Sequence, residues 1–213
     1  MLMNIDLTSL EIPDLWYHGT IQIHATNIMD DINLNIAQPN LDFGKGFYLT
    51  SNPFQAWRRA VSKTNLHNKN RSRILKHTPD KKIEIAVPAI IEFEIDLTIL
   101  SFLNGLKFDK EDLNWAKFIL SNRSETEIIT DELHNKDNQF DYIYGPMADG
   151  YGLSAIIEEA EETGNINKFF DDILGKHARF PEENQLSIHT EIAKSAVTSK
   201  GVIYNEPSKS FRR

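Results

Sequence analysis

The most informative stretch of the sequence spans residues 42–50 and reads Asp-Phe-Gly-Lys-Gly-Phe-Tyr-Leu-Thr. The two glycines on either side of Lys45 let the backbone approach a ligand closely, because glycine has no side chain. The last four residues of the stretch are aromatic and β-prone, which predicts a strand. Asn52 and Pro53 follow and are typical of a helix N-cap and first turn. The glycine turn is therefore expected to lead into a strand and then into a helix.

Hydrophobic periodicity predicts further elements on both sides of this turn. Before it, Leu15 to His18 reads as a strand that ends in a turn at Gly19. After it, the helix that Pro53 opens is predicted to end near Thr64. The other predicted elements are a helix at 21–31, an exposed basic loop at 67–82, strands at 86–97, 140–144, 185–189 and 201–204, helices at 109–120, 154–162 and 166–174, and a short helix capped by Thr190. Strands at both ends of the chain with helices between them predict an α+β protein with one domain over residues 1–213.

Composition excludes several classes of protein. The chain has 213 residues, 40% hydrophobic and 25% charged, and no cysteine, which is typical of a globular domain and excludes a disulfide scaffold. Its apolar stretches are far shorter than the roughly 20 residues of a membrane span, and its first residues do not resemble a signal peptide, so we expect cytoplasmic residence and no membrane partner. The lack of cysteine and of any His-Glu-x-x-His spacing predicts no metal.

The net charge of −8 conceals a strongly basic segment. Residues 58–82 hold nine basic residues and a single acid, Asp80, so this segment carries +8 and the remaining 188 residues carry −16. The basic residues are Arg58, Arg59, Lys63, Lys69, Arg71, Arg73, Lys76, Lys81 and Lys82. Such asymmetry is compatible with a surface that faces phosphates, and equally with a solvated segment that balances acidic neighbours.

Three local segments could carry chemistry: residues 16–20 (Trp-Tyr-His-Gly-Thr), the glycine turn at 42–50, and residues 183–188 (Glu-Asn-Gln-Leu-Ser-Ile). Each also has a structural interpretation when taken singly. A histidine at a strand end is commonly a packed residue, and the glycine turn has neither the Walker spacing nor the dinucleotide-binding Gly-x-Gly-x-x-Gly.

Taken in order, these segments resemble the poly(ADP-ribose) polymerase and diphtheria-toxin branch of the ADP-ribosyltransferase superfamily, whose triad is His, Tyr and usually Glu. The chain is still more similar to a bacterial family of uncharacterised domains assigned to that superfamily. This nearer resemblance extends from about Trp16 to Ala196 and includes the His-Gly-Thr, Asp-Phe-Gly-Lys-Gly-Phe-Tyr-Leu-Thr and Asn-Gln-Leu-Ser-Ile-His-Thr-Glu motifs. It implies a single ADP-ribosyltransferase-like domain with a core at about 15–205. The implied fold has two small mixed sheets that flank an NAD cleft, with helices around them.

The resemblance also implies roles for individual residues. His18 would hydrogen-bond a ribose hydroxyl of NAD, the backbone of Gly19 would hold the nicotinamide carboxamide, and Tyr48 would stack on the nicotinamide ring. Gln185 occupies the place of the catalytic glutamate. The implied NAD-binding set is His18, Gly19, Thr20, Lys45, Gly46, Tyr48 and Trp57. NAD is expected as co-substrate, with no metal.

This sequence departs from the family pattern at several positions. Gln185 is neutral where the polymerases carry glutamate, so chain elongation of ADP-ribose is not expected. Glu183 shares a strand face with Gln185 and either supplies the missing carboxylate or is a solvated residue. Ala56 replaces a serine that contacts the carboxamide, and Arg59 replaces a second stacking aromatic. Trp57 either substitutes for that aromatic or packs in the core.

Two further basic residues allow alternative interpretations. Lys45 would either neutralise the pyrophosphate or fix the turn. Arg123 would bind phosphate or cap the carbonyl groups at the end of its helix.

The expected function is a mono-ADP-ribosyltransferase that moves ADP-ribose from NAD to a macromolecule, and the basic segment makes nucleic acid one candidate acceptor beside protein. A role as a toxin or in phage defence, with an antitoxin as partner, is an analogy to such families. The alternatives are an NAD glycohydrolase and a catalytically inactive module that binds NAD or ADP-ribose.

Overall fold

The computed structural model describes residues 13, 15–124, 134–148, 152–174 and 184–207. These residues form two compact units. The first, here called the Gln185 unit, comprises the described residues of Asn33–Tyr48 and Asp96–Ala196. The second, the His18 unit, comprises those of Ile12–Ile32, Leu49–Ile95 and Val197–Arg213.

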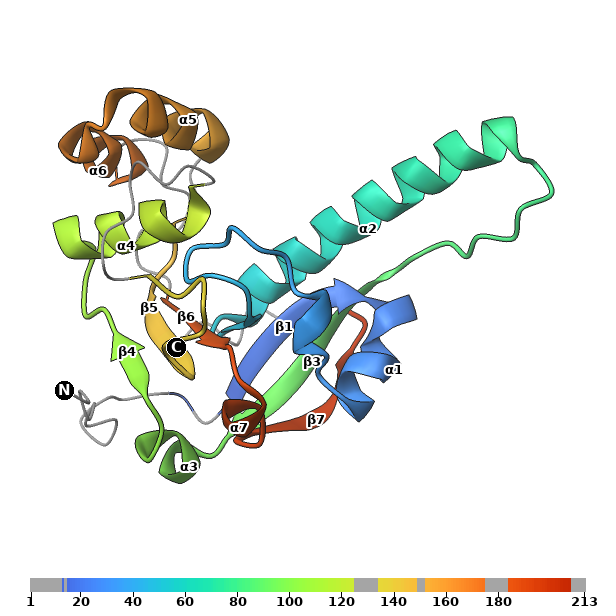
Figure 1. The fold of residues 1–213 in the computed structure, drawn as a ribbon. Helices are drawn as coiled ribbons and strands as arrows, with labels where there is room; N and C mark the ends of the chain where they lie inside the picture. Colours follow the sequence, from blue (N-terminus) through green and yellow to red (C-terminus); the bar gives the residue numbers. More distant parts are fainter. Residues whose placement is uncertain (1–12, 14, 125–133, 149–151, 175–183, 208–213) are drawn as a thin grey trace. The chain divides into compact units, whose positions relative to one another are not determined.

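The His18 unit is built on an antiparallel arrangement of strands (Figure 1). Its elements are β1 (Leu15–Ile21), α1 (Gln22–Asp30), α2 (Pro53–His77), β3 (Pro88–Ile95) and β7 (Val197–Ile203). Strand β3 pairs with β1 on one edge and with β7 on the other. Helix α2 packs against β1 and β3. The period-2 pattern of 86–97 predicted β3 correctly, because its apolar residues alternate with Glu92 and Glu94.

Gly19 lies inside β1 and does not end it, so the predicted turn at Gly19 is wrong. A Cβ atom placed on Gly19 would lie 2.0 Å from the carbonyl oxygen of Ala56 on α2. Only glycine permits this close approach of helix and strand. The apolar contact there consists of Tyr17, Ala56 and Ile90, with Trp57 packed against them.

Helix α2 begins as predicted but ends thirteen residues later than predicted, at His77. The side chain of Asn52 accepts hydrogen bonds from the backbone N–H groups of Phe54 and Gln55, which is the expected N-cap. The segment predicted as a loop lacks an apolar stripe, yet no glycine or proline interrupts residues 54–78. Figure 1 shows α2 extending past the strands of its unit, with the chain returning alongside it.

The Gln185 unit combines short strands with most of the remaining helices. Its elements are the 3-10 helix η2 (Leu34–Ile36), α3 (Leu97–Ser101), β4 (Gly105–Lys107), α4 (Leu113–Arg123), β5 (Tyr142–Pro146), α5 (Leu153–Thr163), α6 (Ile166–Leu174), β6 (Asn184–Ile188) and α7 (Glu191–Lys194). Strand β5 pairs in parallel with β4 and antiparallel with β6. An aromatic core fills the unit, built around Phe43, Phe108, Trp115 and Phe118.

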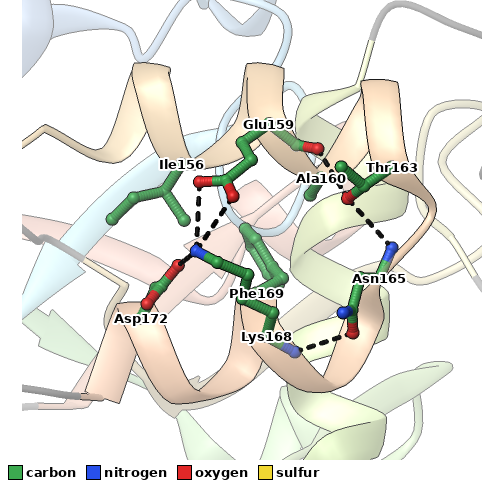
Figure 2. Close-up of a pocket in the computed structure, with 8 residues that line it drawn as sticks. All are labelled: Ile156, Glu159, Ala160, Thr163, Asn165, Lys168, Phe169 and Asp172. Atoms are coloured by element: carbon green, nitrogen blue, oxygen red, sulfur yellow. Dashed lines mark hydrogen bonds and ion pairs between the residues drawn. The ribbon is translucent and has the colours of Figure 1, made fainter.

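Helices α5 and α6 line a shallow surface pocket (Figure 2). The ammonium group of Lys168 lies across it and pairs with Glu159 at 3.0 Å and Asp172 at 2.5 Å. Phe169 is fully buried below these pairs. The Lys168–Glu159 pair joins the two helices across the pocket, whereas Asp172 lies on the same helix as Lys168. We assign the pocket no chemistry.

The strand order is β4-β5-β6-β2-β1-β3-β7, in which β2 (Phe47–Thr50) is divided between the units after Tyr48. The protein is therefore of mixed α and β composition, as the sequence predicted, but its strands follow one hydrogen-bonded order where two separate sheets were expected. Among the described residues, no helix is both long and apolar enough to cross a membrane.

Candidate functional site

Asp42 is the centre of a buried polar network in the Gln185 unit. Its Oδ1 atom accepts a hydrogen bond from Nε of Arg123 at 2.6 Å. Its Oδ2 atom accepts from Nε2 of Gln185 at 2.8 Å and from the backbone N–H of Ala148 at 3.0 Å. The carboxylate is 4% exposed. A buried carboxylate needs such partners, and here a cation and two neutral donors supply them.

Gln185 lies in β6, opposite Gly145 of β5, and is buried. Because a carboxylate only accepts hydrogen bonds, the bond to Asp42 fixes which end of the Gln185 amide faces it. The amide oxygen, Oε1, then points away from Asp42. Within the described part of the chain, this oxygen accepts no hydrogen bond. Among the described side chains, the one fully buried polar atom without a hydrogen-bond partner is a different atom, Oγ1 of Thr64. The bond to Asp42 therefore holds Oε1 of Gln185, a hydrogen-bond acceptor, in a fixed direction.

Tyr48 is attached to the glycine turn by its hydroxyl group. The hydroxyl accepts a hydrogen bond from the backbone N–H of Phe43 at 3.0 Å and donates one to the carbonyl oxygen of Gly44 at 2.6 Å. Burial, followed by the nearby charge of Asp42, raises the pKa of Tyr48 well above 10, so the phenol stays protonated. Its ring is half-buried and lies edge-on to His189, with the centroids 6.4 Å apart. The hydroxyl thus fixes the orientation of the ring, which also stacks on Phe43 with the centroids 6.5 Å apart.

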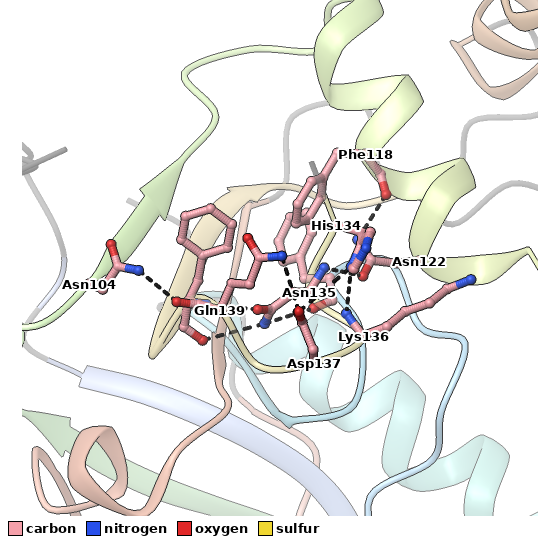
Figure 3. Close-up of polar contacts among 10 residues, drawn as sticks. Asn104, Phe118, Asn122, His134, Asn135, Lys136, Asp137 and Gln139 are labelled. Atoms are coloured by element: carbon pink, nitrogen blue, oxygen red, sulfur yellow. Dashed lines mark hydrogen bonds and ion pairs between the residues drawn. The ribbon is translucent and has the colours of Figure 1, made fainter. Parts of the chain in front are cut away.

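Asparagine side chains lie next to the turn: Nδ2 of Asn135 donates to the carbonyl oxygen of Phe43 at 3.5 Å. Figure 3 shows Asn135 close to Asn122. Asn122 donates to the carbonyl oxygen of Phe118 and accepts from the backbone N–H of Asn135 at 2.8 Å. Gly44 has φ +85°, and a Cβ there would lie 2.9 Å from the carbonyl oxygen of Asn135. Glycine is therefore required at this position by both conformation and space.

Lys45 and Gly46 contact His189, which follows β6. Nδ1 of His189 donates to the carbonyl oxygen of Lys45 at 2.8 Å, and its Nε2 atom is 2.7 Å from Oγ of Ser187. A Cβ on Gly46 would lie 2.6 Å from the imidazole. The backbone of Lys45 is thereby fixed, while its side chain is partly exposed. Burial lowers the pKa of His189 to about 4, so the ring is neutral at physiological pH.

This buried histidine predicts that the protein loses stability in mild acid. The imidazole of residue 189 binds a proton near pH 6.5 in the unfolded chain but only near pH 4 in the folded chain. The contribution of His189 to stability is therefore constant above pH 6.5 and is lost below it. The expected loss in unfolding free energy between pH 7 and pH 5 is about 2 kcal/mol. Urea denaturation across this range measures it.

His189→Gln is expected to remove most of this pH dependence. His24→Gln, which changes an exposed histidine of α1, is the matched control and should leave it unchanged. If the unfolding free energy of the two variants changed equally with pH, the pH dependence would not be due to His189.

In the His18 unit, the predicted residues gather around a lysine. Nζ of Lys63 donates to the carbonyl oxygen of Gly19 at 2.8 Å and lies 3.3 Å from Nε2 of His18. Burial and the neighbouring charge of Arg59 lower the pKa of Lys63 to about 8. Thr20 is buried, and Trp57 packs against the apolar contact beside Gly19. The ammonium group of Lys63 therefore binds the backbone of Gly19, which the resemblance assigned to the nicotinamide carboxamide.

The structure thus groups the predicted site residues by unit. Tyr48, Lys45, Gly46 and Gln185 belong to the Gln185 unit, and His18, Gly19, Thr20 and Trp57 to the His18 unit. Glu183 lies outside the described residues. Arg123, for which binding of phosphate or capping of its helix was expected, pairs with Asp42.

Sequence reasoning missed the roles of Asp42 and Lys63. Asp42 was visible as an acid at the start of the glycine turn, and Lys63 as a member of the basic segment. No local pattern connected Asp42 with Gln185, or Lys63 with Gly19.

Among the described residues, no group of three or more His, Asp or Glu side chains is placed to hold a metal ion. Comparison with known proteins finds no match among curated proteins or among solved structures. A family model described as a protein of unknown function, DUF3990, matches residues 15–198, which is most of the chain. The chain therefore belongs to the DUF3990 family of proteins of unknown function.

Proposed function

We propose that this protein is an NAD-dependent mono-ADP-ribosyltransferase that transfers ADP-ribose from NAD to a macromolecular acceptor. The observation that carries the proposal is the hydrogen bond between Asp42 and Gln185. It orients an acceptor oxygen at the strand position where the resembling family places its catalytic glutamate. The resemblance of the His18, Tyr48 and Gln185 segments in chain order supports the same function.

The proposed reaction breaks the N-glycosidic bond of NAD. The bonding electron pair leaves with nicotinamide, positive charge develops on the ribose, and a nucleophile on the acceptor attacks C1 and loses its proton. A fixed acceptor that holds a ribose hydroxyl orients the sugar and places negative potential near this charge. Oε1 of Gln185 has these properties. The half-buried ring of Tyr48 offers a face for the nicotinamide, which must be held as it departs.

Asp42 compensates in part for the missing glutamate. A neutral acceptor makes hydrogen bonds about half as strong as a charged one. A carboxylate that accepts from Nε2 of Gln185 polarises the amide, so its oxygen becomes more negative. The negative charge that this polarisation adds to the amide oxygen is smaller than the full charge of a glutamate. It is consistent with transfer of a single ADP-ribose and not with activation of a second ribose hydroxyl for chain elongation.

The experiment is incubation of the purified protein with adenine-labelled NAD and a cell extract. Label that becomes attached to macromolecules supports the transferase. Its release by nuclease or by protease then identifies the acceptor class. Free ADP-ribose alone would replace the proposal with NAD glycohydrolysis. Binding of NAD without turnover would leave an inactive binding module.

Tyr48 provides a matched pair of variants for the NAD site. Tyr48→Ala removes the ring and is expected to weaken NAD binding about tenfold, because stacking contributes about 0.5–1.5 kcal/mol beyond the buried area. Tyr48→Phe keeps the ring and loses the bonds to Phe43 and Gly44, each worth about 1 kcal/mol of stability. It should melt at a lower temperature yet bind NAD within about threefold of the wild type. Isothermal titration calorimetry measures the NAD affinity of both variants. If Tyr48→Ala and Tyr48→Phe lost the same affinity for NAD, the ring of Tyr48 would not act by stacking.

A further inference from the structure

Helix α2 has an unusual charge distribution along its whole length. Its 25 residues include seven lysines and arginines and no acid. Residues Arg58, Lys69, Arg73 and Lys76 are all exposed. At 3.6 residues per turn they lie within about 60° of one another around the helix axis. We call these four residues the cationic stripe.

The described residues of the His18 unit contact a different side of the helix. Three side chains of the helix are hydrogen-bonded to the segment that returns from α2 to β3. Nε2 of His67 lies 3.1 Å from the carbonyl oxygen of Glu84. Asn68 exchanges hydrogen bonds with the backbone of Ala86 in both directions, at 3.0 and 2.9 Å. Nε of Arg71 donates to the carbonyl oxygen of Ile83 at 2.8 Å. Around the helix axis, Asn68 and Arg71 both lie more than about 80° from the centre of the cationic stripe. The stripe therefore faces outward from its own unit.

Three of the four charges of the stripe are not balanced nearby. Within the described residues, no ion pair joins Lys69, Arg73 or Lys76 to an acid. Asp80 is the only acid in residues 58–82. Neighbouring cations on a rigid helix repel one another, and a polyanion would relieve this repulsion.

We propose that the cationic stripe binds the phosphate backbone of double-stranded nucleic acid without regard to sequence. From Arg58 to Lys76 the helix rises about 27 Å, which matches about eight base-pair steps of a duplex. Residues 58–82 contain no Phe, Tyr or Trp. Single-stranded nucleic acid is usually held by stacking on aromatic side chains, so the absence of aromatics favours a duplex. This inference stands independently of the proposed reaction with NAD.

Fluorescence anisotropy of a labelled DNA duplex of about 20 base pairs, titrated with the full chain without NAD, tests the proposal. Binding is expected to weaken with salt, with a slope of log K against log salt of about −3 to −4 for four phosphate contacts. Lys69→Gln/Arg73→Gln removes two of these contacts. It should reduce the magnitude of the slope by about 2 and weaken binding at least about tenfold at low salt.

Lys81→Gln/Lys82→Gln is the matched control, because it removes the same charge from the same segment beyond the end of the helix. It should weaken binding less than about threefold. Equal losses for the two double variants would overturn the stripe as the binding surface. An unbound duplex would overturn the proposal, and salt-sensitive self-association in sedimentation would then identify a second, acidic copy of the chain as occupant. Because NAD is absent, neither result bears on the transferase.

Discussion

Asp42→Ala is expected to abolish NAD turnover and to cost about 3 kcal/mol of unfolding free energy. The substitution leaves the guanidinium of Arg123, the amide of Gln185 and the backbone N–H of Ala148 without their shared acceptor. Breaking a buried charge pair usually costs about 3–5 kcal/mol. The lower value applies because the Arg123 side chain is 22% exposed and can reach water. The free Gln185 amide can then rotate, so its acceptor oxygen loses its fixed direction.

Asp141→Asn is the matched control for this prediction. Asp141 also accepts two hydrogen bonds in the Gln185 unit, from the backbone of Asn104 and from the hydroxyl of Thr190. It does not contact Gln185. The control should lose stability while each folded molecule keeps its NAD turnover. Urea denaturation and NAD consumption per folded protein measure both effects. Full turnover in folded Asp42→Ala would show that Asp42 does not position Gln185.

Much of the fold could be predicted because its signals are local. The alternation of Ile91 and Phe93 with Glu92 and Glu94 identifies β3. Asn52 with Pro53 identifies the start of α2. The end of α2 was missed because residues 67–77 show no apolar stripe. Their helix is stabilised from outside by the bonds of Asn68 and Arg71 to the returning chain. The sequence did offer one signal for the longer helix, because residues 54–78 contain no glycine or proline.

The Asp42 network could not be predicted, because its members are far apart in the sequence. Gln185 lies 143 residues from Asp42, and Arg123 lies 81 residues away. No period or motif connects such positions. The resemblance assigns roles to Gln185 and Tyr48, but it describes the usual glutamate and not the way a glutamine is held. Buried polar partners of this kind become visible only when the chain is folded.

Gln185→Glu is expected to lower both activity and stability, although it introduces the residue that the resembling family carries. In the wild type, Nε2 of Gln185 lies 2.8 Å from Oδ2 of Asp42. The substitution turns this donor into an oxygen and places two carboxylates against each other. This pair of carboxyl groups then has one pKa raised above that of the unfolded chain, so stability is lost as the pH rises through the unfolded value towards the raised one. At pH 7 the expected cost is about 3 kcal/mol.

The double variant Asp42→Asn/Gln185→Glu separates this repulsion from other effects. Asparagine at position 42 can donate to a carboxylate at position 185, so the hydrogen bond returns with donor and acceptor exchanged. The backbone N–H of Ala148 loses its acceptor, so recovery of stability should be partial. NAD turnover should recover more fully, because the acceptor at 185 is again oriented and is now charged. If Gln185→Glu alone were more active than the wild type, Asp42 would not constrain this site, and Gln185 would instead mark a domain that binds NAD without consuming it.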